Sequence, residues 1–343
     1  TAPIPLLAGW EAARAVERFG GRLRGLARAL PSIHMLVAPE LWLSALYYGH
    51  IEQMIAVWLS LAAIRMLSER RAWAAGALLG LALLARSDVA LLILPIALTL
   101  VARRRLLDVT WLAVGGALTT VAGLAPFLLA DRSDTLFSLV TFRAALPVGG
   151  GNIWSLSDAP AFLEIGQRYD AALVVGAATL LTLLFLVTKR ALTVTAPDFL
   201  LLLAVSALCF PLLIKTLWPY YYQEAALFAT VWAMARAVAP LSAWRAWSRS
   251  SLVGAIALLW LPRLVILGLA LLAEYGLEAT SYDGWLPPWG VIVGSANIAV
   301  LALTVATLIA TPSVLALLAP EPAAPQRAIL PEVAQSAPAE GGS

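Results

Sequence analysis

Ten long apolar segments, joined by short polar links, dominate this 343-residue sequence. Hydrophobic residues make up 61% of the chain and charged residues only 13%, where a soluble domain has about half and about a quarter. The runs are continuous and rich in Leu and Ala, unlike the alternating strands of a membrane barrel. The sequence therefore predicts an all-α fold, a polytopic transmembrane helical bundle of about ten spans with structured extracytoplasmic loops. The segments cover residues 29–46, 53–68, 72–85, 89–102, 109–130, 171–188, 198–214, 225–238, 251–272 and 290–310.

The domain organisation follows from these segments. We expect residues 1–311 to form one transmembrane domain, with a basic cytoplasmic segment at 11–28 and a long outer loop at 131–170. Residues 312–343 are rich in Pro, Ala and Glu, a composition that predicts a disordered cytoplasmic tail. The chain begins at Thr1 and not at Met, so we expect it to lack upstream residues.

The distribution of basic residues sets the expected orientation. If the spans alternate, one side of the membrane receives 17 of the 23 Lys and Arg residues, and the other side receives five. Cytoplasmic loops carry the excess of Lys and Arg in membrane proteins. We therefore predict a multi-pass protein of the bacterial plasma membrane (the inner, cytoplasmic membrane), with an acidic outer side that holds any active site.

A short hairpin stands out on that outer side. Segments 72–85 and 89–102 have 14 residues each, which as helices would extend about 21 Å at 1.5 Å per residue. That is short of the ~30 Å hydrocarbon core. We expect the turn Arg86-Ser87-Asp88 to lie below the outer surface, where the arginine could bind phosphate oxygens. The alternative is that Arg86 pairs with Asp88 or extends its charge to the interface.

A second candidate group precedes the segment 53–68. His50 and Glu52 lie two residues apart, so on a helix they would point to different faces, whereas in a turn they could converge. Either side chain could assist proton transfer or bind a sugar hydroxyl, and these two are the catalytic candidates. The alternative is an interfacial helix cap flanked by Tyr47 and Tyr48.

Two further groups complete the predicted substrate-binding set. Lys215, Tyr220, Tyr221 and Glu224 combine a cation, aromatic rings and a carboxylate, which could hold a lipid phosphate and a sugar ring. Aromatic residues also populate every membrane interface, which is the plainer explanation. In the outer loop, Asn152 and Trp154 follow a Gly triplet and lie near Arg143.

Several function classes are disfavoured. We find no phosphate-binding glycine loop, dinucleotide fingerprint, nucleophile elbow or zinc-ligand spacing. The single cysteine, Cys209, allows no intrachain disulfide, and a net charge of +3 gives no reason to expect nucleic acid as a partner. We identify no cofactor and no metal site, and leave a divalent metal open.

The motifs resemble a known family. Gly49-His50-Ile51-Glu52-Gln53, the basic link Glu69-Arg70-Arg71, the run from Ala75 to Arg86 and the dipeptide Leu94-Pro95 are similar to bacterial multi-pass glycosyltransferases of the GT-C fold. The nearest likeness is to the mannosyltransferase-like branch that uses polyprenyl-phosphate sugars. The likeness covers roughly residues 30–235, where the outer-loop and Tyr220 regions also match in character.

This resemblance implies an inverting transfer of a hexose, with mannose as the expected sugar, from polyprenyl phosphate to an extracytoplasmic glycan or lipid acceptor. Membrane lipids are the other implied partners. Two departures are visible: the family has Pro where this chain has Ile51, and Lys where it has Arg86. The acidic residue that serves as catalytic base in the family usually lies in a first outer loop, and we expect this sequence to begin after that loop, so we do not transfer that role to Glu52.

Two other classes of function stay open. The chain could be a transporter or flippase for a lipid or small solute, although it shows no paired halves with matching interrupted helices. It could also be a non-catalytic membrane paralogue.

Overall fold

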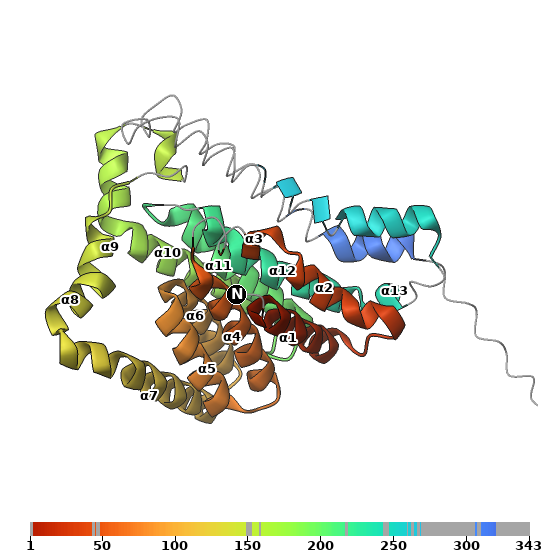
Figure 1. Ribbon diagram of the computed structural model, residues 1–343, viewed down its shortest axis with the longest axis horizontal. Coiled ribbons are helices and arrows are strands. Elements are labelled where there is room, and N and C mark those ends of the chain that lie inside the picture. The colour runs from red at the N-terminus through yellow and green to blue at the C-terminus, as the bar shows by residue number, and fades with distance from the viewer. Residues whose placement is uncertain are drawn as a thin grey trace, which may run out of the picture.

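The fold was obtained as a computed structural model. It describes residues 3–42, 45, 49–148, 153–157, 159–216, 219–242, 247–258 and 310–319, with isolated residues at 260, 261, 264, 265, 268 and 306. Throughout these residues the structure is helical and contains no strand, as the composition predicts (Figure 1).

The helices follow the predicted apolar segments closely over the middle of the chain. In order they are α1 (Pro3–Gly20), η1 (Gly25–Ala29), α2 (Leu30–Leu36), α3 (Pro39–Trp42), α4 (Ile51–Ser68), α5 (Ala72–Ala85), η3 (Ser87–Val89), α6 (Ala90–Ala102), α7 (Leu106–Ala130), α8 (Arg132–Leu136), η4 (Phe137–Thr141), α9 (Phe142–Ala145), η5 (Ile153–Leu156), α10 (Pro160–Thr188), α11 (Pro197–Leu213), η6 (Pro219–Tyr222), α12 (Gln223–Arg236) and α13 (Val238–Ser242). A further helix covers 249–258, and another covers 310–318.

Helix α4 is the central element of the bundle. It starts at Ile51, two residues after Gly49, whose φ of +71° is a conformation that glycine adopts without strain. It ends at Ser68, shortly before Arg70 turns the chain with a φ of 62°. α4 packs against α1 and α5, and 72% of it is buried inside the protein. The first turn of α4 therefore projects into the interior of one end of the bundle.

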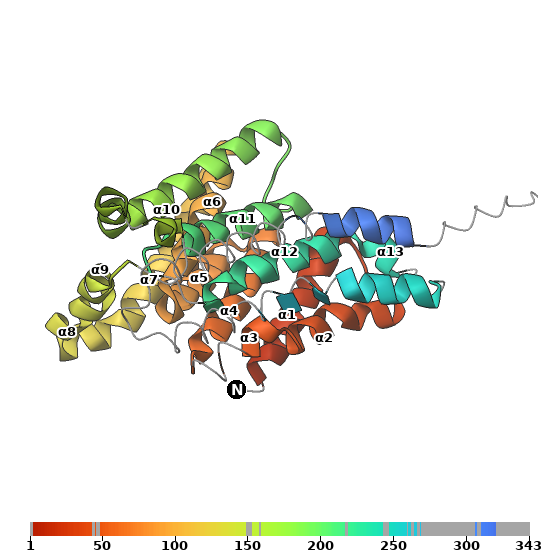
Figure 2. The same ribbon diagram turned by 90° about the horizontal axis from the view of Figure 1, so that it is seen from above.

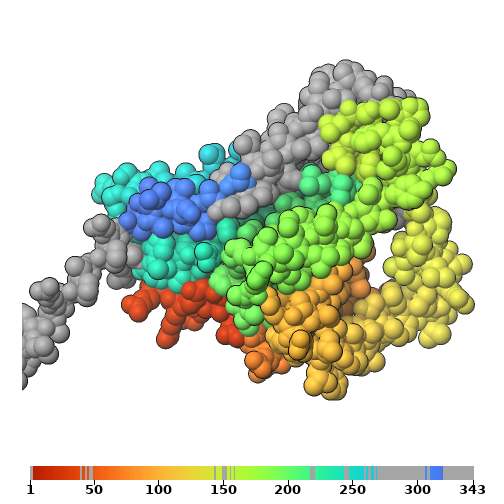
Figure 3. Space-filling view, turned by 180° about the vertical axis from the view of Figure 1, so that it is seen from behind, coloured from red at the N-terminus to blue at the C-terminus, as the bar shows by residue number. Residues whose placement is uncertain are grey.

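The other helices surround α4 in two connected groups. α5 packs against α7, while α10 packs against α6 and α11, and α12 joins α11 to α1. Figures 1 and 2 show α7, α8 and α9 leaving the bundle as an arm that returns to it through α10. Seen from behind, α10 lies across the outside of the molecule, and an open space separates the α7–α8 arm from the body (Figure 3).

Three helices, α4, α7 and α10, are long and apolar enough to cross a membrane. α7 and α10 present large apolar side chains outward, such as Leu129, which is 87% exposed, and in water such surface would be costly. The described helices therefore indicate a membrane protein. The count of about ten spans is not established, because α5, α6, α11 and 249–258 are shorter and most of 251–272 and 290–310 lies outside the described residues.

The pair α5 and α7 is held by a glycine seam, formed by Gly76 and Gly80 on α5 with Gly115 and Gly116 on α7. A Cβ atom on Gly76 would lie 2.1 Å from the carbonyl oxygen of Leu112, and one on Gly115 would lie 2.3 Å from that of Trp73. No side chain fits between backbones this close. Small residues four apart are the usual means by which helices approach in a bilayer, where dispersion contacts drive association.

The two ends of the bundle differ in their side chains. At the basic end, Arg18 of α1 reaches Ser68 of α4, and Arg103 of α6 donates to the Leu192 carbonyl 2.6 Å away. At the opposite, acidic end, the start of α4 meets the start of α12 and the end of α5. The helices therefore alternate in direction as the distribution of basic residues predicts for this part of the chain.

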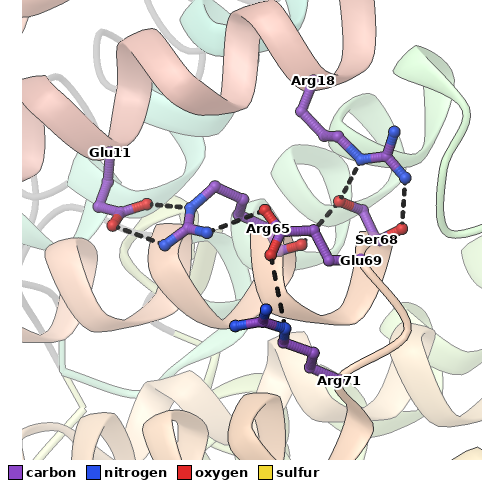
Figure 4. A network of polar contacts seen from close by, with 6 residues as sticks. All are labelled: Glu11, Arg18, Arg65, Ser68, Glu69 and Arg71. Atoms are coloured by element: carbon purple, nitrogen blue, oxygen red, sulfur yellow. Dashed lines mark hydrogen bonds and ion pairs between the residues drawn. The ribbon is translucent and has the colours of Figure 1, made fainter.

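A buried ion-pair network closes the basic end (Figure 4). Arg65 binds Glu11 through two hydrogen bonds, of 2.7 Å from Nε and 3.0 Å from Nη2, and its Nη1 lies 2.9 Å from Glu69. Arg18 donates from Nε to the Ser68 hydroxyl at 3.0 Å and from Nη2 to the Ser68 carbonyl at 2.5 Å. Arg65 and Glu11 are almost wholly buried, so each neutralises the charge of the other.

The structure corrects four predicted boundaries. Segment 29–46 is not one helix, because α2 ends at Leu36 and α3 starts at Pro39, which cannot continue a preceding hydrogen-bond ladder. Basic residues 11–20 continue the apolar start of the chain in α1. α10 begins at Pro160, so the outer loop is shorter than 131–170, and α8, η4, α9 and η5 lie within it.

The fourth correction concerns the tail. The segment expected to be disordered from residue 312 is helical as far as 318, because its first residues continue an apolar pattern. Leu315 is fully buried, and Leu318 approaches Gly254 of the helix at 249–258. The prediction for 320–343 lies outside the described residues.

Candidate functional site

The acidic end holds a cluster of polar side chains from three parts of the chain. We call it the polar cluster and define it as His50, Glu52, Gln53, Arg86, Asp88, Tyr221, Gln223 and Glu224. The first three lie at the start of α4, the next two in the turn between α5 and α6, and the last three at the junction of η6 and α12. The Arg86–Asp88 group and the Tyr221–Glu224 group therefore meet, and Gln53 joins them to the start of α4, where His50 and Glu52 lie.

His50 and Glu52 form a close pair at the rim of this cluster. His50 occupies the N-cap position of α4 with non-helical φ and ψ angles, which turns its side chain towards the first helical turn. Its Nδ1 lies 2.5 Å from Oε1 of Glu52, so the two side chains converge as they would in a turn. Each is about one-third exposed, at 38% and 34%, and can meet a ligand from outside. A carboxylate that fixes an imidazole in this way prepares it to accept a proton.

Arg86 is the cation of the cluster. It lies in an extended conformation (φ −149°), which ends α5, and its Nη2 lies 3.4 Å from Oδ2 of Asp88. Its guanidinium carbon lies 5.2 Å from the ring centre of Tyr221, within the range of a cation–π contact. Tyr221 in turn packs against Phe210 of α11. The planar guanidinium of an arginine matches the oxygens of a phosphate, so Arg86 is the group of the cluster suited to bind one.

Glu224 is the most deeply placed carboxylate of the cluster. It is 5% exposed and accepts a hydrogen bond from Nε2 of Gln53, which links the first turns of α4 and α12. Asp88 and Arg86 lie near enough for their charges to act on it in opposite directions. Next to it, burial raises the pKa of the Tyr222 hydroxyl above its ordinary value.

Sequence reasoning missed two members of the cluster, Gln53 and Gln223. Both are fully buried amides at the ends of apolar segments. Oε1 of Gln53 and both polar side-chain atoms of Gln223 have no hydrogen-bond partner within the described part of the chain. A polar residue at the inner start of an otherwise apolar helix is the sequence signal that could have identified them.

Lys215 and Trp154 lie outside the cluster and hold the outer loop in place. Nζ of Lys215 donates to the Ala144 carbonyl 2.7 Å away, and its backbone N–H donates to Asp170 at 3.2 Å. Nε1 of Trp154 donates to the carbonyl of Leu213 at 2.8 Å. Both side chains are buried, so this geometry gives them a tethering role at the end of α11.

The remaining predicted residues are only partly described. Tyr220 lies in η6, although its side chain falls outside the description, as does that of Arg143 in α9. Asn152, Tyr47 and Tyr48 lie outside the described residues altogether.

The chemistry available to the cluster is therefore acid–base and anion-binding chemistry. Within the part of the chain that the structure describes, no three His, Cys, Asp or Glu side chains gather to hold a metal ion. Compared with known protein families, curated proteins and solved structures, the chain matches no family model, no curated protein and no solved structure. Its function has to be argued from the polar cluster itself.

Proposed function

We propose that this protein is a membrane glycosyltransferase that moves a hexose, with mannose as the expected sugar, from a polyprenyl-phosphate donor to an extracytoplasmic glycan or lipid acceptor. The observation that carries the proposal is the polar cluster, in which a His–Glu pair and an arginine in cation–π contact with a tyrosine lie at one end of a bundle of apolar helices. A lipid-linked donor reaches such a site from within the membrane and requires no nucleotide site.

Each part of the reaction has a group suited to it. The His50–Glu52 pair takes the proton from the acceptor hydroxyl as its oxygen attacks the anomeric carbon of the sugar. The bond from that carbon to the phosphate oxygen breaks with inversion, and polyprenyl phosphate leaves. Arg86 stabilises the charge that develops on this phosphate. The His50–Glu52 pair is about one-third exposed and faces the acceptor, whereas Arg86 is more enclosed.

The orientation of the protein in the membrane follows from the difference in charge between the two ends of the bundle. The basic end contains most of the Arg and Lys residues, which are retained in the cytoplasm. The polar cluster is then extracytoplasmic in the bacterial inner membrane, where a lipid-linked sugar replaces nucleotide sugars as the donor.

The test is transfer of labelled mannose from polyprenyl phosphate by the full-length gene product in membranes. His50→Gln and Glu52→Gln should each lower the rate about 10- to 100-fold, because each removes or misorients the proton acceptor. Asp108→Asn, which alters a carboxylate at the basic end that pairs with Arg105, is the matched control and should leave the rate unchanged. Unchanged transfer in both His50 and Glu52 variants would remove these residues from the mechanism.

Solute transport is the second candidate, favoured by the burial of Glu224 beside polar groups at one end of the helices. Buried carboxylates in membrane proteins commonly serve proton or solute pathways. Uptake of a solute into proteoliposomes, without any sugar transfer, would favour this alternative. Neither activity in an intact, folded protein would favour a non-catalytic paralogue.

A further inference from the structure

Among the residues that the structure describes, four buried polar atoms of Gln53, Asp88 and Gln223 have no hydrogen-bond partner: Oε1 of Gln53, Oδ1 of Asp88, and Nε2 and Oε1 of Gln223. Gln53 and Gln223 are fully buried, and Asp88 has a side chain only 7% exposed. More than nine in ten buried polar groups in folded proteins are hydrogen-bonded, and each unmet one is costly. Three of these atoms belong to amides in the first turns of α4 and α12, and the fourth belongs to Asp88 in η3. A ligand is the natural partner for amide and carboxylate groups at the polar end of a bundle.

The kind of ligand follows from the atoms. Three of the four are acceptors and the fourth is an amide nitrogen with two hydrogens to donate. Hydroxyl groups both donate and accept, so a polyhydroxylated molecule complements this set. An anion would be repelled by three acceptors and is better served by Arg86. An apolar group would leave every atom unmet.

We infer that Gln53, Asp88 and Gln223 bind the hydroxyl groups of the sugar, and that Gln223 determines which sugar is accepted. This inference rests on the proposed function and deepens it by separating two subsites. In one subsite Arg86 binds the phosphate, and in the other the buried amides of Gln53 and Gln223 bind the hydroxyl groups of the hexose. Glu224 fixes Gln53 through their hydrogen bond, so that Oε1 of Gln53 remains directed to the ligand.

The signature of this role is opposite changes in stability and binding. Met has nearly the shape of Gln but no polar side-chain atoms, so Gln223→Met removes two unmet groups from the free protein. The melting temperature of the ligand-free protein should rise by about 2 °C. If Gln223 had a purely structural role, its side chain would have hydrogen-bond partners in the protein. Gln223→Met would then remove those hydrogen bonds and lower the melting temperature.

Binding is measured on the full chain in nanodiscs with three probes: farnesyl phosphate mannose, its singly deoxygenated analogues, and farnesyl phosphate without sugar. Wild-type protein should bind at least one deoxy analogue about tenfold or more weakly than the parent, because the missing hydroxyl leaves a buried group unmet. Gln223→Met should bind the parent 10- to 100-fold more weakly, no longer distinguish that analogue, and bind farnesyl phosphate like the wild type.

Ser60→Ala is the matched control. Ser60 is a fully buried residue of α4 whose hydroxyl also has no partner, and it lies about 10 Å along the helix from Gln53 at 1.5 Å per residue. This variant should gain stability and keep the wild-type preference among the probes. If Gln223→Met retains the wild-type discrimination, or loses stability, the inference is overturned.

The two proposals fail separately. Suppose that the wild-type protein transfers mannose and that Gln223→Met keeps the wild-type discrimination between sugars. This result would overturn the inference and leave the proposed function standing. Protein that binds the sugar-bearing probe through Gln223 but transfers nothing would overturn the proposed function and support the hydroxyl site. A wild type that binds the parent no better than farnesyl phosphate would overturn the inference.

Discussion

The two ends of α4 carry polar groups of the same kinds, but these groups differ in whether they have hydrogen-bond partners. At the basic end, Arg65 is enclosed by Glu11 and Glu69, and its network is complete (Figure 4). At the acidic end, amide and carboxylate oxygens of Gln53, Asp88 and Gln223 have no hydrogen-bond partner among the described residues. The complete network holds helices together, whereas the unpartnered atoms are the basis of the ligand site that we infer. Whether the buried polar groups have hydrogen-bond partners, more than whether they are charged, distinguishes the structural end of the bundle from the end that we propose to be functional.

The largest effect should come from opening the complete network. Arg65→Met leaves the Glu11 carboxylate buried without its partner and should cost about 3–5 kcal/mol of stability. Thermal unfolding in detergent measures this loss. The double variant Arg65→Met/Glu11→Leu removes both charges and should recover most of it, with mannose transfer at the wild-type rate. A double variant as unstable as Arg65→Met would mean that the charges contribute more than mutual neutralisation.

Removing the arginine, alone or together with its carboxylate partner, should have a different outcome at the acidic end. Arg86→Met should lower mannose transfer about 100- to 1,000-fold, because the charge on the leaving phosphate loses its preorganised donor. Arg86→Met/Asp88→Asn relieves the buried carboxylate and should restore the melting temperature without restoring transfer. Recovery of both properties in the double variant would make Arg86 a structural ion pair like Arg65.

The smallest effect should come from Asp131, an exposed carboxylate of the outer loop with its partners already in place. Its side chain caps α8 by accepting from the backbone N–H of Asp134 at 3.0 Å and from the Ser133 hydroxyl at 2.8 Å. These bonds lower its pKa. The cap is therefore intact above the ordinary Asp pKa of about 3.9 and is lost as the pH falls through the lowered folded value.

Asp131→Ala should speed amide hydrogen exchange in α8 at pH 5, and the difference from the wild type should shrink as the carboxylate is protonated. Transfer activity should be unchanged. A clear loss of transfer would extend the site into the outer loop.

Sequence alone predicted the middle of this fold well, because apolar length and charge breaks determine where membrane helices end. The bounds of α5 are those predicted, and α4, α7, α11 and α12 differ from prediction by three residues or fewer. The region before Gly49 was predicted less well, since Pro39 divides an otherwise continuous apolar segment. α10 extends beyond its apolar core because polar residues can continue a helix above a membrane.

The candidate site was predicted only in part. His50, Glu52, Arg86 and Tyr221 could be selected from sequence because charged and aromatic residues are conspicuous beside apolar segments. Their arrangement could not be predicted, since it depends on a contact between the first turns of α4 and α12, where Gln53 and Glu224 are 171 residues apart in the chain. The role of Lys215 also depends on tertiary structure, because only the fold shows that its amine reaches the Ala144 carbonyl.

The glycine seam between α5 and α7 has a mechanical consequence. Two helices whose main chains touch cannot rotate or slide past each other without collision, so α5 and the start of α7 must move as one piece. Arg86 directly follows α5 and is thereby anchored to the membrane-facing arm. Any widening of the site to admit a bulky acceptor must therefore come from displacement of η6 and α12, with the arginine as the fixed point of reference.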